Sequence, residues 1–228
     1  MDAWVVGLVL VAVIGLAVIA YGAVSDRRRH RRALAEVKAP PKRDIPKFAP
    51  DAPAPHYLTD LEAHRPPADA PSLDLTVEQR RQTREQLADP ATREVPVRRA
   101  SDHFVTDRET SWSVLDGPRV LVCADPVRSV RELLGVLERM IVGRQPIVII
   151  APEFTDEVRR TLEVNLIQRR LTIFAGTADA AGRAAAAAAT GATPASVDDL
   201  RAGYLPDDHL GRCRRWVAEP GGSFVVAG

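Results

Sequence analysis

The chain has 228 residues, 18 prolines and a formal net charge of +1. Its length suggests one domain with additional segments. Its nearly neutral charge argues against a nucleic-acid-binding protein, which would usually carry a basic face and a high pI. Cys123 and Cys213 have no spacing suited to a metal ion. We expect both thiols to be buried and reduced, in a reducing compartment. The sequence alone also allows a disulfide between them.

The first predicted element is a long apolar helix. Residues 3–25 carry no ionisable side chain except Tyr21. As a helix they would be roughly 34 Å long, enough to cross a hydrocarbon core of about 30 Å. We expect a transmembrane helix within residues 1–25 rather than a cleaved signal peptide. The reasons are that Met1-Asp2-Ala3 lacks a cation and that a basic cluster follows the apolar run.

This basic cluster sets the expected topology. Its arginines are Arg27, Arg28, Arg29, Arg31 and Arg32. Because positive charge stays on the cytoplasmic side, we expect a single-pass protein of the cell membrane, with its N-terminus outside and its C-terminal domain in the cytoplasm. The arginines are also expected to lie on anionic lipid headgroups, although setting the topology would be a sufficient role.

Residues 26–96 are predicted to be a basic flank and a proline-rich linker. Eleven of the prolines lie between Pro40 and Pro96, and such sequence favours an extended chain over a packed one. The linker is expected to run from Lys38 to about Ser72. Near residues 75–88, the stretch "LTVEQRRQTREQL" predicts a short polar helix that is solvated or lightly docked.

Residues 97–228 predict a compact α/β domain. Apolar runs indicate strands at 119–124, 146–151 and 171–176. A final hairpin is expected to turn at Pro220-Gly221-Gly222. Because the run at 146–151 does not alternate, its strand should be buried on both faces.

Helices are expected between and after these strands. The first should begin at Asp125-Pro126 and end before Gly143. Thr155 is expected to cap the second helix, and Gly191 to close an alanine-rich third helix.

Four stretches occur in a recognisable order between His103 and Gly228. They are "FVTDRET", "VRSVRELLGVLERMIVGRQPIVIIA", "TLEVNLIQRRLTIFA" and "DDHLGRCRRWVAEPGGSFVVAG". In this order they resemble the apical domain of group I chaperonins, the GroEL family. The resemblance implies a chaperonin apical-domain-like α/β fold, in which sheets are flanked by two groove helices that bind segments of other proteins.

Two departures from that family bear on function. The family's ATP-binding motifs are absent, and no glycine-rich phosphate loop replaces them. The family's basic loop after the third strand is also missing. We therefore expect an ATP-independent binding module, with no nucleotide, cofactor or metal ion.

The resemblance places a protein-binding groove on two helices. On the first helix, Leu134, Leu137 and Ile141 fall on the groove, and the acidic Glu138 matches the family motif. A second apolar row holds Leu133, Val136 and Met140. The helix is thus apolar over more of its circumference than one packed face requires. The alternative is that both rows are buried.

The second groove wall differs from the family pattern. Arg159 and Glu163 stand where the family has apolar residues, whereas Val164 stays apolar. Phe104, next to His103, matches an aromatic pair of the groove. A partly charged wall favours one chosen partner, because unmatched charges penalise other proteins.

Three functions agree with this pattern. The leading interpretation is a membrane-anchored, non-catalytic module that presents the groove to a specific protein on the cytoplasmic side. The alternatives are an accessory structural subunit of a membrane protein complex and an ATP-independent holdase at the membrane. An enzyme is the weakest interpretation, because the five histidines are scattered and suggest no catalytic set.

Overall fold

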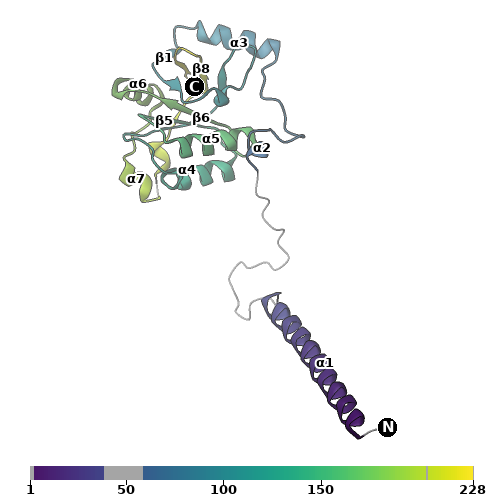
Figure 1. Cartoon of the computed structure of the whole chain (residues 1–228). Coiled ribbons are helices and arrows are strands. Elements are labelled where there is room, and N and C mark those ends of the chain that lie inside the picture. The colour runs from purple at the N-terminus through teal and green to yellow at the C-terminus, as the bar shows by residue number, and fades with distance from the viewer. Residues whose placement is uncertain (1–2, 39–58, 204, 228) are drawn as a thin grey trace. The chain divides into compact units, whose positions relative to one another are not determined.

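The computed structural model describes residues 3–38, 59–203 and 205–227. Two compact units make up the chain, Met1–His56 and Tyr57–Gly228 (Figure 1). The second unit begins well before residue 97, the expected start of the compact domain. The difference arises because the segment after Tyr57 packs on the domain, as described below. Most of the expected linker, residues 39–58, lies outside the described residues.

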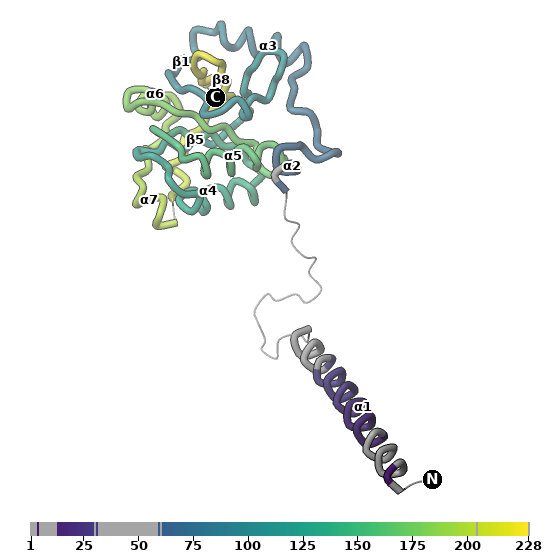
Figure 2. Tube along the Cα trace, in the orientation of Figure 1, coloured from purple at the N-terminus to yellow at the C-terminus, as the bar shows by residue number. Residues whose placement is uncertain are grey.

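Over its described residues, the first unit contains one helix, α1 (Ala3–Lys38), which continues from the apolar segment into the basic cluster (Figure 2). Over the described residues, no helix has both the length and the hydrophobicity needed to cross a membrane. The side chains of residues 5–12, which belong to the expected span, lie outside the described residues. The anchor therefore stays a prediction.

Two sheets form the centre of the second unit. The five-stranded sheet has the order β2-β6-β5-β4-β7, and its three central strands are parallel. Its strands are β2 (Arg98–Arg99), β4 (Arg119–Val122), β5 (Ile147–Ala151), β6 (Ile173–Thr177) and β7 (Gly211–Arg212). All five residues of β5 are buried, as the unbroken apolar run predicts.

The second sheet is antiparallel and has the order β1-β9-β8-β3. Its strands are β1 (Arg93–Val95), β3 (Ser113–Asp116), β8 (Arg215–Ala218) and β9 (Ser223–Val226). Strands β8 and β9 form the hairpin that was expected around Pro220-Gly221-Gly222. Trp216 of β8 packs against Phe174 of β6, with ring centroids 6.0 Å apart, so the two sheets share one core.

Helices cover the five-stranded sheet on both faces (Figure 1). One face carries α4 (Val130–Gly143), α5 (Asp156–Ile167) and the short α7 (Val197–Arg201). The other face carries α6 (Ala180–Thr190) and the four-stranded sheet. Thr155 caps α5 and Gly191 closes α6 in a left-handed conformation, which confirms both predictions.

Both ends of α4 differ from the prediction. The helix is capped by Ser129, which forms a capping box with Glu132. Asp125 instead accepts a hydrogen bond from the Val197 backbone N–H at the start of α7. Val127 pairs with Phe154 in a short β-bridge, which keeps the chain extended before Ser129. At the other end, Arg144 takes the left-handed conformation and Gly143 is still helical.

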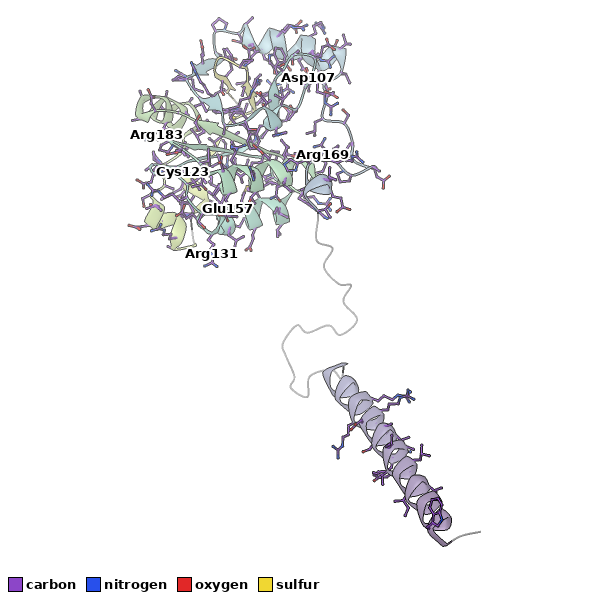
Figure 3. The ribbon with its side chains drawn as sticks, viewed as in Figure 1. Asp107, Cys123, Arg131, Glu157, Arg169 and Arg183 are labelled. Carbon is purple, nitrogen blue, oxygen red and sulfur yellow. The ribbon has the colours of Figure 1, made fainter. Side chains whose placement is uncertain are left out.

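The chain before β1 is part of the second unit. It contains α2 (Asp60–Ala63) and α3 (Val77–Leu87), the polar helix expected near residues 75–88. Arg80 of α3 is buried and donates two hydrogen bonds to Asp107, from Nε at 3.0 Å and from Nη2 at 2.8 Å. Asp107, labelled in Figure 3, is itself fully buried. A buried ion pair therefore holds α3 to the domain, while most of the other residues of this polar helix stay exposed.

Candidate protein-binding surface

Helix α4 separates its apolar residues onto two faces. Its buried apolar side chains are Leu133, Val136, Leu137 and Met140. Its exposed apolar side chains are Leu134, Ile141 and Val142, with exposed fractions of 48%, 43% and 86%. We call these three residues the α4 strip. The buried side chains pack the helix against the sheet. The additional apolar side chains noted in the sequence are the ones that remain exposed to solvent.

The strip differs from the expected set in two residues, because it lacks Leu137 and includes Val142. Leu137 is only 6% exposed, which corrects its assignment to an open groove. It lies one residue after Val136 and four after Leu133, on the side of the helix that meets the sheet. Leu134 and Ile141 are exposed as the resemblance implies, and Glu138 is exposed between them. Arg131 projects from the same helix, as Figure 3 shows.

Val142 is the residue that sequence reasoning missed. It is the most exposed of the three strip residues and stands directly after Ile141 in the last turn of α4. The sequence does contain a signal for it, because Val142 is apolar but belongs to neither of the two apolar rows of the helix. Because no buried row needs Val142, its side chain is free to extend the strip.

Neighbouring helices define the sides of α4. A Cβ atom placed on Gly135 would lie 2.7 Å from the carbonyl oxygen of Gly203, so the segment after α7 closes directly on this helix. Leu200 of α7 and Leu205 are buried. Part of the apolar surface of α4 is thus covered by α7, and the strip lies outside this contact.

The charges of the second wall are paired within α5. Arg159 donates to Glu163 Oε1 at 2.7 Å and to Asp156 Oδ1 at 2.9 Å. These hydrogen bonds raise the pKa of Arg159, with the bond to Asp156 as the larger cause. Glu163 is only 2% exposed, which corrects its expected place on an open wall. Arg159 and Val164 are half-buried, so the open apolar surface belongs mainly to α4.

Phe104 is also removed from the expected groove. It ends the short 3-10 helix η1 (Asp102–Phe104) and is fully buried. Its ring packs edge-on against Phe174, with centroids 6.3 Å apart. The aromatic ring therefore stabilises the core, and the exposed member of the pair is His103.

The segment before α3 docks at the C-terminal end of α5. Gln168 donates from Nε2 to the backbone oxygens of Glu62 and Arg65, at 2.7 and 2.9 Å. Arg169, labelled in Figure 3 beside α2, donates to the Pro71 oxygen at 3.4 Å. This segment and η1 enclose a cavity of about 490 Å³ whose lining is mostly polar. What was expected to be free linker thus covers one end of the helix layer.

The remaining predicted groups fall into two sets. Arg27, Arg28, Arg29 and Arg31 are exposed, and the side chain of Arg32 lies outside the described residues. Cys123 and Cys213 are buried free thiols. Burial raises the pKa of each thiol to about 12, so neither is a reactive nucleophile at neutral pH.

Curated proteins similar to this chain are chaperonins. No family model matches the sequence. Chaperonin GroEL of Mycoplasma pneumoniae is 32% identical over 137 residues, which is 57% of this chain and 25% of that protein. Chaperonin GroEL of Mycoplasma genitalium is 34% identical over 76 residues, 33% of this chain and 14% of that protein. The chain thus spans a quarter or less of these relatives.

Similar solved structures are also chaperonins. The open-state monomer of a group II chaperonin from Methanococcoides burtonii has a TM-score of 0.41 and 14% identity, and the match covers 60% of this chain and 30% of that one. Chaperonin gp146 from bacteriophage EL has a TM-score of 0.48 and 18% identity, over 60% of this chain and 28% of that one. The sequence relatives carry the assignment, and over the matched residues this chain has a chaperonin-like domain, in agreement with its resemblance to an apical domain.

Proposed function

We propose that this chain is a non-catalytic protein-binding module. Its chaperonin-like domain presents the α4 strip to a partner protein at the cytoplasmic face of the cell membrane. The observation that carries the proposal is the exposure of Leu134, Ile141 and Val142 on a helix whose other row already seals the core. Similarity to GroEL over 137 residues supports protein as the ligand class.

The form of the strip indicates what kind of segment it binds. Its apolar side chains come from one helix, whereas Arg159 on the neighbouring helix is already paired with Asp156 and Glu163. Such a surface suits a narrow amphipathic segment better than an arbitrary unfolded chain. Glu138, exposed between Leu134 and Ile141, favours a cation on the partner and disfavours an acidic one.

Membrane attachment is the second part of the proposal. Its support is the uncharged segment of residues 3–25, followed by the arginine cluster. These features favour a domain on the cytoplasmic side and arginines near anionic headgroups. Anchoring would hold the α4 strip at one membrane surface and so raise its effective concentration toward partners in that membrane.

Two alternatives make different demands on the strip. An accessory subunit of a membrane complex would make its main contact through residues 3–25 and would tolerate changes in the strip. An ATP-independent holdase would bind many unfolded chains through the strip, with little selectivity. The specific-partner proposal requires both dependence on the strip and selectivity.

Site-specific photo-crosslinking in native membranes tests these alternatives. A photo-reactive residue replaces Leu134 or Val142 in the full chain, and Val77 of α3 supplies a control, since it is apolar and 79% exposed. We expect one discrete adduct from both strip positions and none from Val77. Adducts of equal yield at Val77, or no adduct at the strip, would contradict the proposal.

Aggregation assays separate the holdase. The purified full chain should not suppress the aggregation of unrelated unfolded proteins if the strip serves one partner. Broad suppression that is lost in Leu134→Glu would favour the holdase instead.

A further inference from the structure

A second surface feature lies at the edge of the five-stranded sheet, where β4, the end of α4, the 3-10 helix η2 (Asp207–His209) and β7 meet. It is a cavity of about 600 Å³. Its charged lining residues, among those described, are Arg119, Arg139, Arg212 and Asp207. Three guanidinium groups therefore face one carboxylate.

The arginines lie close enough to repel one another. Arg119 of β4 and Arg212 of β7 are direct partners in an antiparallel pair, and like charges in that position repel each other. Burial lowers the pKa of Arg119, and the charges of Arg212 and Arg139 lower it further, while Asp207 acts in the opposite direction. The domain holds an excess of positive charge at this edge.

Buried donors in the cavity also lack partners. Arg119 is 7% exposed, and its Nη2 donates to the Asp207 backbone oxygen at 2.6 Å. Its Nε and the Nη2 of Arg139 have no hydrogen-bond partner among the described residues. Leaving such donors without hydrogen-bond partners is unfavourable, and more so for charged groups. A ligand with several acceptor oxygens would remove this cost and the repulsion together.

We propose that this cavity, the arginine cavity below, binds a phosphate group. Guanidinium forks match the oxygens of phosphate in bidentate pairs. Three arginines and one aspartate leave a lining charge of two positive units, which balances a phosphate dianion. The bound group is free phosphate or a phosphate monoester on a small molecule or lipid headgroup.

The arginine cavity is separate from the α4 strip. None of the three strip residues lines the cavity, although Arg139 precedes Val142 by three residues and its side chain points only about 60° away from that of Val142 around the helix. Arg119 and Arg212 belong to β4 and β7. Phosphate binding can therefore be tested independently of protein capture.

The test measures thermal unfolding of the full chain in a non-ionic detergent, with phosphate or with chloride at equal ionic strength. We expect phosphate to raise the Tm and Arg212→Gln to abolish most of that rise. Arg212 is exposed, so this change should preserve the fold. It should also raise the Tm without phosphate, because it removes the repulsion with Arg119. Arg214→Gln is the matched control, since Arg214 is exposed and does not line the cavity.

The outcomes decide between binding and general salt effects. An equal Tm rise in Arg212→Gln and Arg214→Gln, or equal effects of phosphate and chloride, would overturn the proposal. A separate series compares inorganic phosphate with glycerol 3-phosphate. A larger shift with glycerol 3-phosphate identifies a monoester, such as a lipid headgroup, and a larger shift with inorganic phosphate identifies free phosphate.

Discussion

Leu134 and Leu137 have the same side chain three positions apart on α4, and they differ almost completely in environment. Leu134 is 48% exposed and Leu137 is 6% exposed. The sequence pattern places both in one apolar row, because the helical period alone does not state which half of a wide stripe meets the sheet. The distinction matters because only the exposed leucine can contact a partner without unfolding.

Glutamate substitutions measure this distinction. Leu137→Glu forces an unpaired carboxylate into an apolar site and should destabilise the domain by several kcal/mol or prevent folding. Leu134→Glu should cost about 1 kcal/mol or less, while crosslinking to the partner falls. Urea unfolding followed by tryptophan fluorescence reports the change, because Trp112 and Trp216 are buried in the domain. An equal loss in both variants would mean that the strip is not free.

Asp107 is a second residue whose role depends on its surroundings. It accepts hydrogen bonds from Arg80, from Thr110 and from the Leu75 backbone N–H. The hydrogen bond from Arg80, followed by those from Thr110 and Leu75, lowers the pKa of Asp107 to about 2, against the opposing effect of burial. One carboxylate thus joins α3 and the segment before it to the domain.

This shift predicts a loss of stability in acid. The folded-state pKa of about 2 lies below the unfolded value of about 3.9, so Asp107 stabilises the fold fully above pH ~4. The contribution, about 2–3 kcal/mol, is lost as the pH falls from about 4 towards about 2. In urea unfolding at several pH values, the free energy of unfolding of Asp107→Asn should fall less steeply with decreasing pH than that of the natural chain. Asp102→Asn is the control, because Asp102 is exposed, and its acid slope should match that of the natural chain.

At the scale of elements, the helix layer is held together by close backbone contact as well as by side chains. Gly135 lies on the side of α4 that meets the segment after α7, where an added Cβ would lie 2.7 Å from the Gly203 oxygen. Gly143, in the last turn of the same helix, has only the flexible Gln145 side chain nearby, at 3.5 Å. A larger side chain is therefore sterically excluded at position 135 but not at position 143.

Alanine substitutions should separate the two glycines. In a helix, alanine is favoured over glycine by about 1 kcal/mol, so Gly143→Ala should preserve or raise the Tm. Gly135→Ala should lower the Tm despite the same helical gain, because the backbone of Gly203 must move away. Differential scanning calorimetry of the two variants measures both effects. A stabilising Gly135→Ala would show that α7 does not close on α4.

At the scale of the whole molecule, the domain extends to residue 57 and the proposed anchor lies before residue 26. The segment from Thr59 to Leu87 contributes α2, α3 and the buried Arg80. It is therefore a part of the domain rather than a spacer. The arginine cluster directs this whole unit to the cytoplasm in the topology that we propose.

Thiol labelling tests the topology. Ser72→Cys places an exposed thiol in the second unit, and we expect it to resist membrane-impermeant reagents until the cells are opened. The natural chain is the background control, because Cys123 and Cys213 are buried with strongly raised pKa values. Labelling of intact cells at this position would reverse the orientation and exclude a cytoplasmic partner.

Local features of the fold could be predicted because they depend on neighbours in the sequence. The cap at Thr155, the left-handed Gly191 and the turn between β8 and β9 are set by the backbone preferences of a few adjacent residues. The central strand β5 is equally local, since an unbroken apolar run can only be buried on both faces. The α/β class followed from these elements in their order, whereas the resemblance to a chaperonin rested on four matching sequence stretches.

The binding surface could not be read from the sequence, because burial depends on elements that are distant along the chain. Phe104 and Leu137 match groove positions, yet β6 and the sheet bury them. Arg80 looks like a solvated helix residue until Asp107 supplies its partner. The sequence by itself determined which residues are apolar, charged or conformationally permissive. Tertiary packing decided which of these residues remain exposed, because each covering contact comes from a segment that the local pattern does not identify.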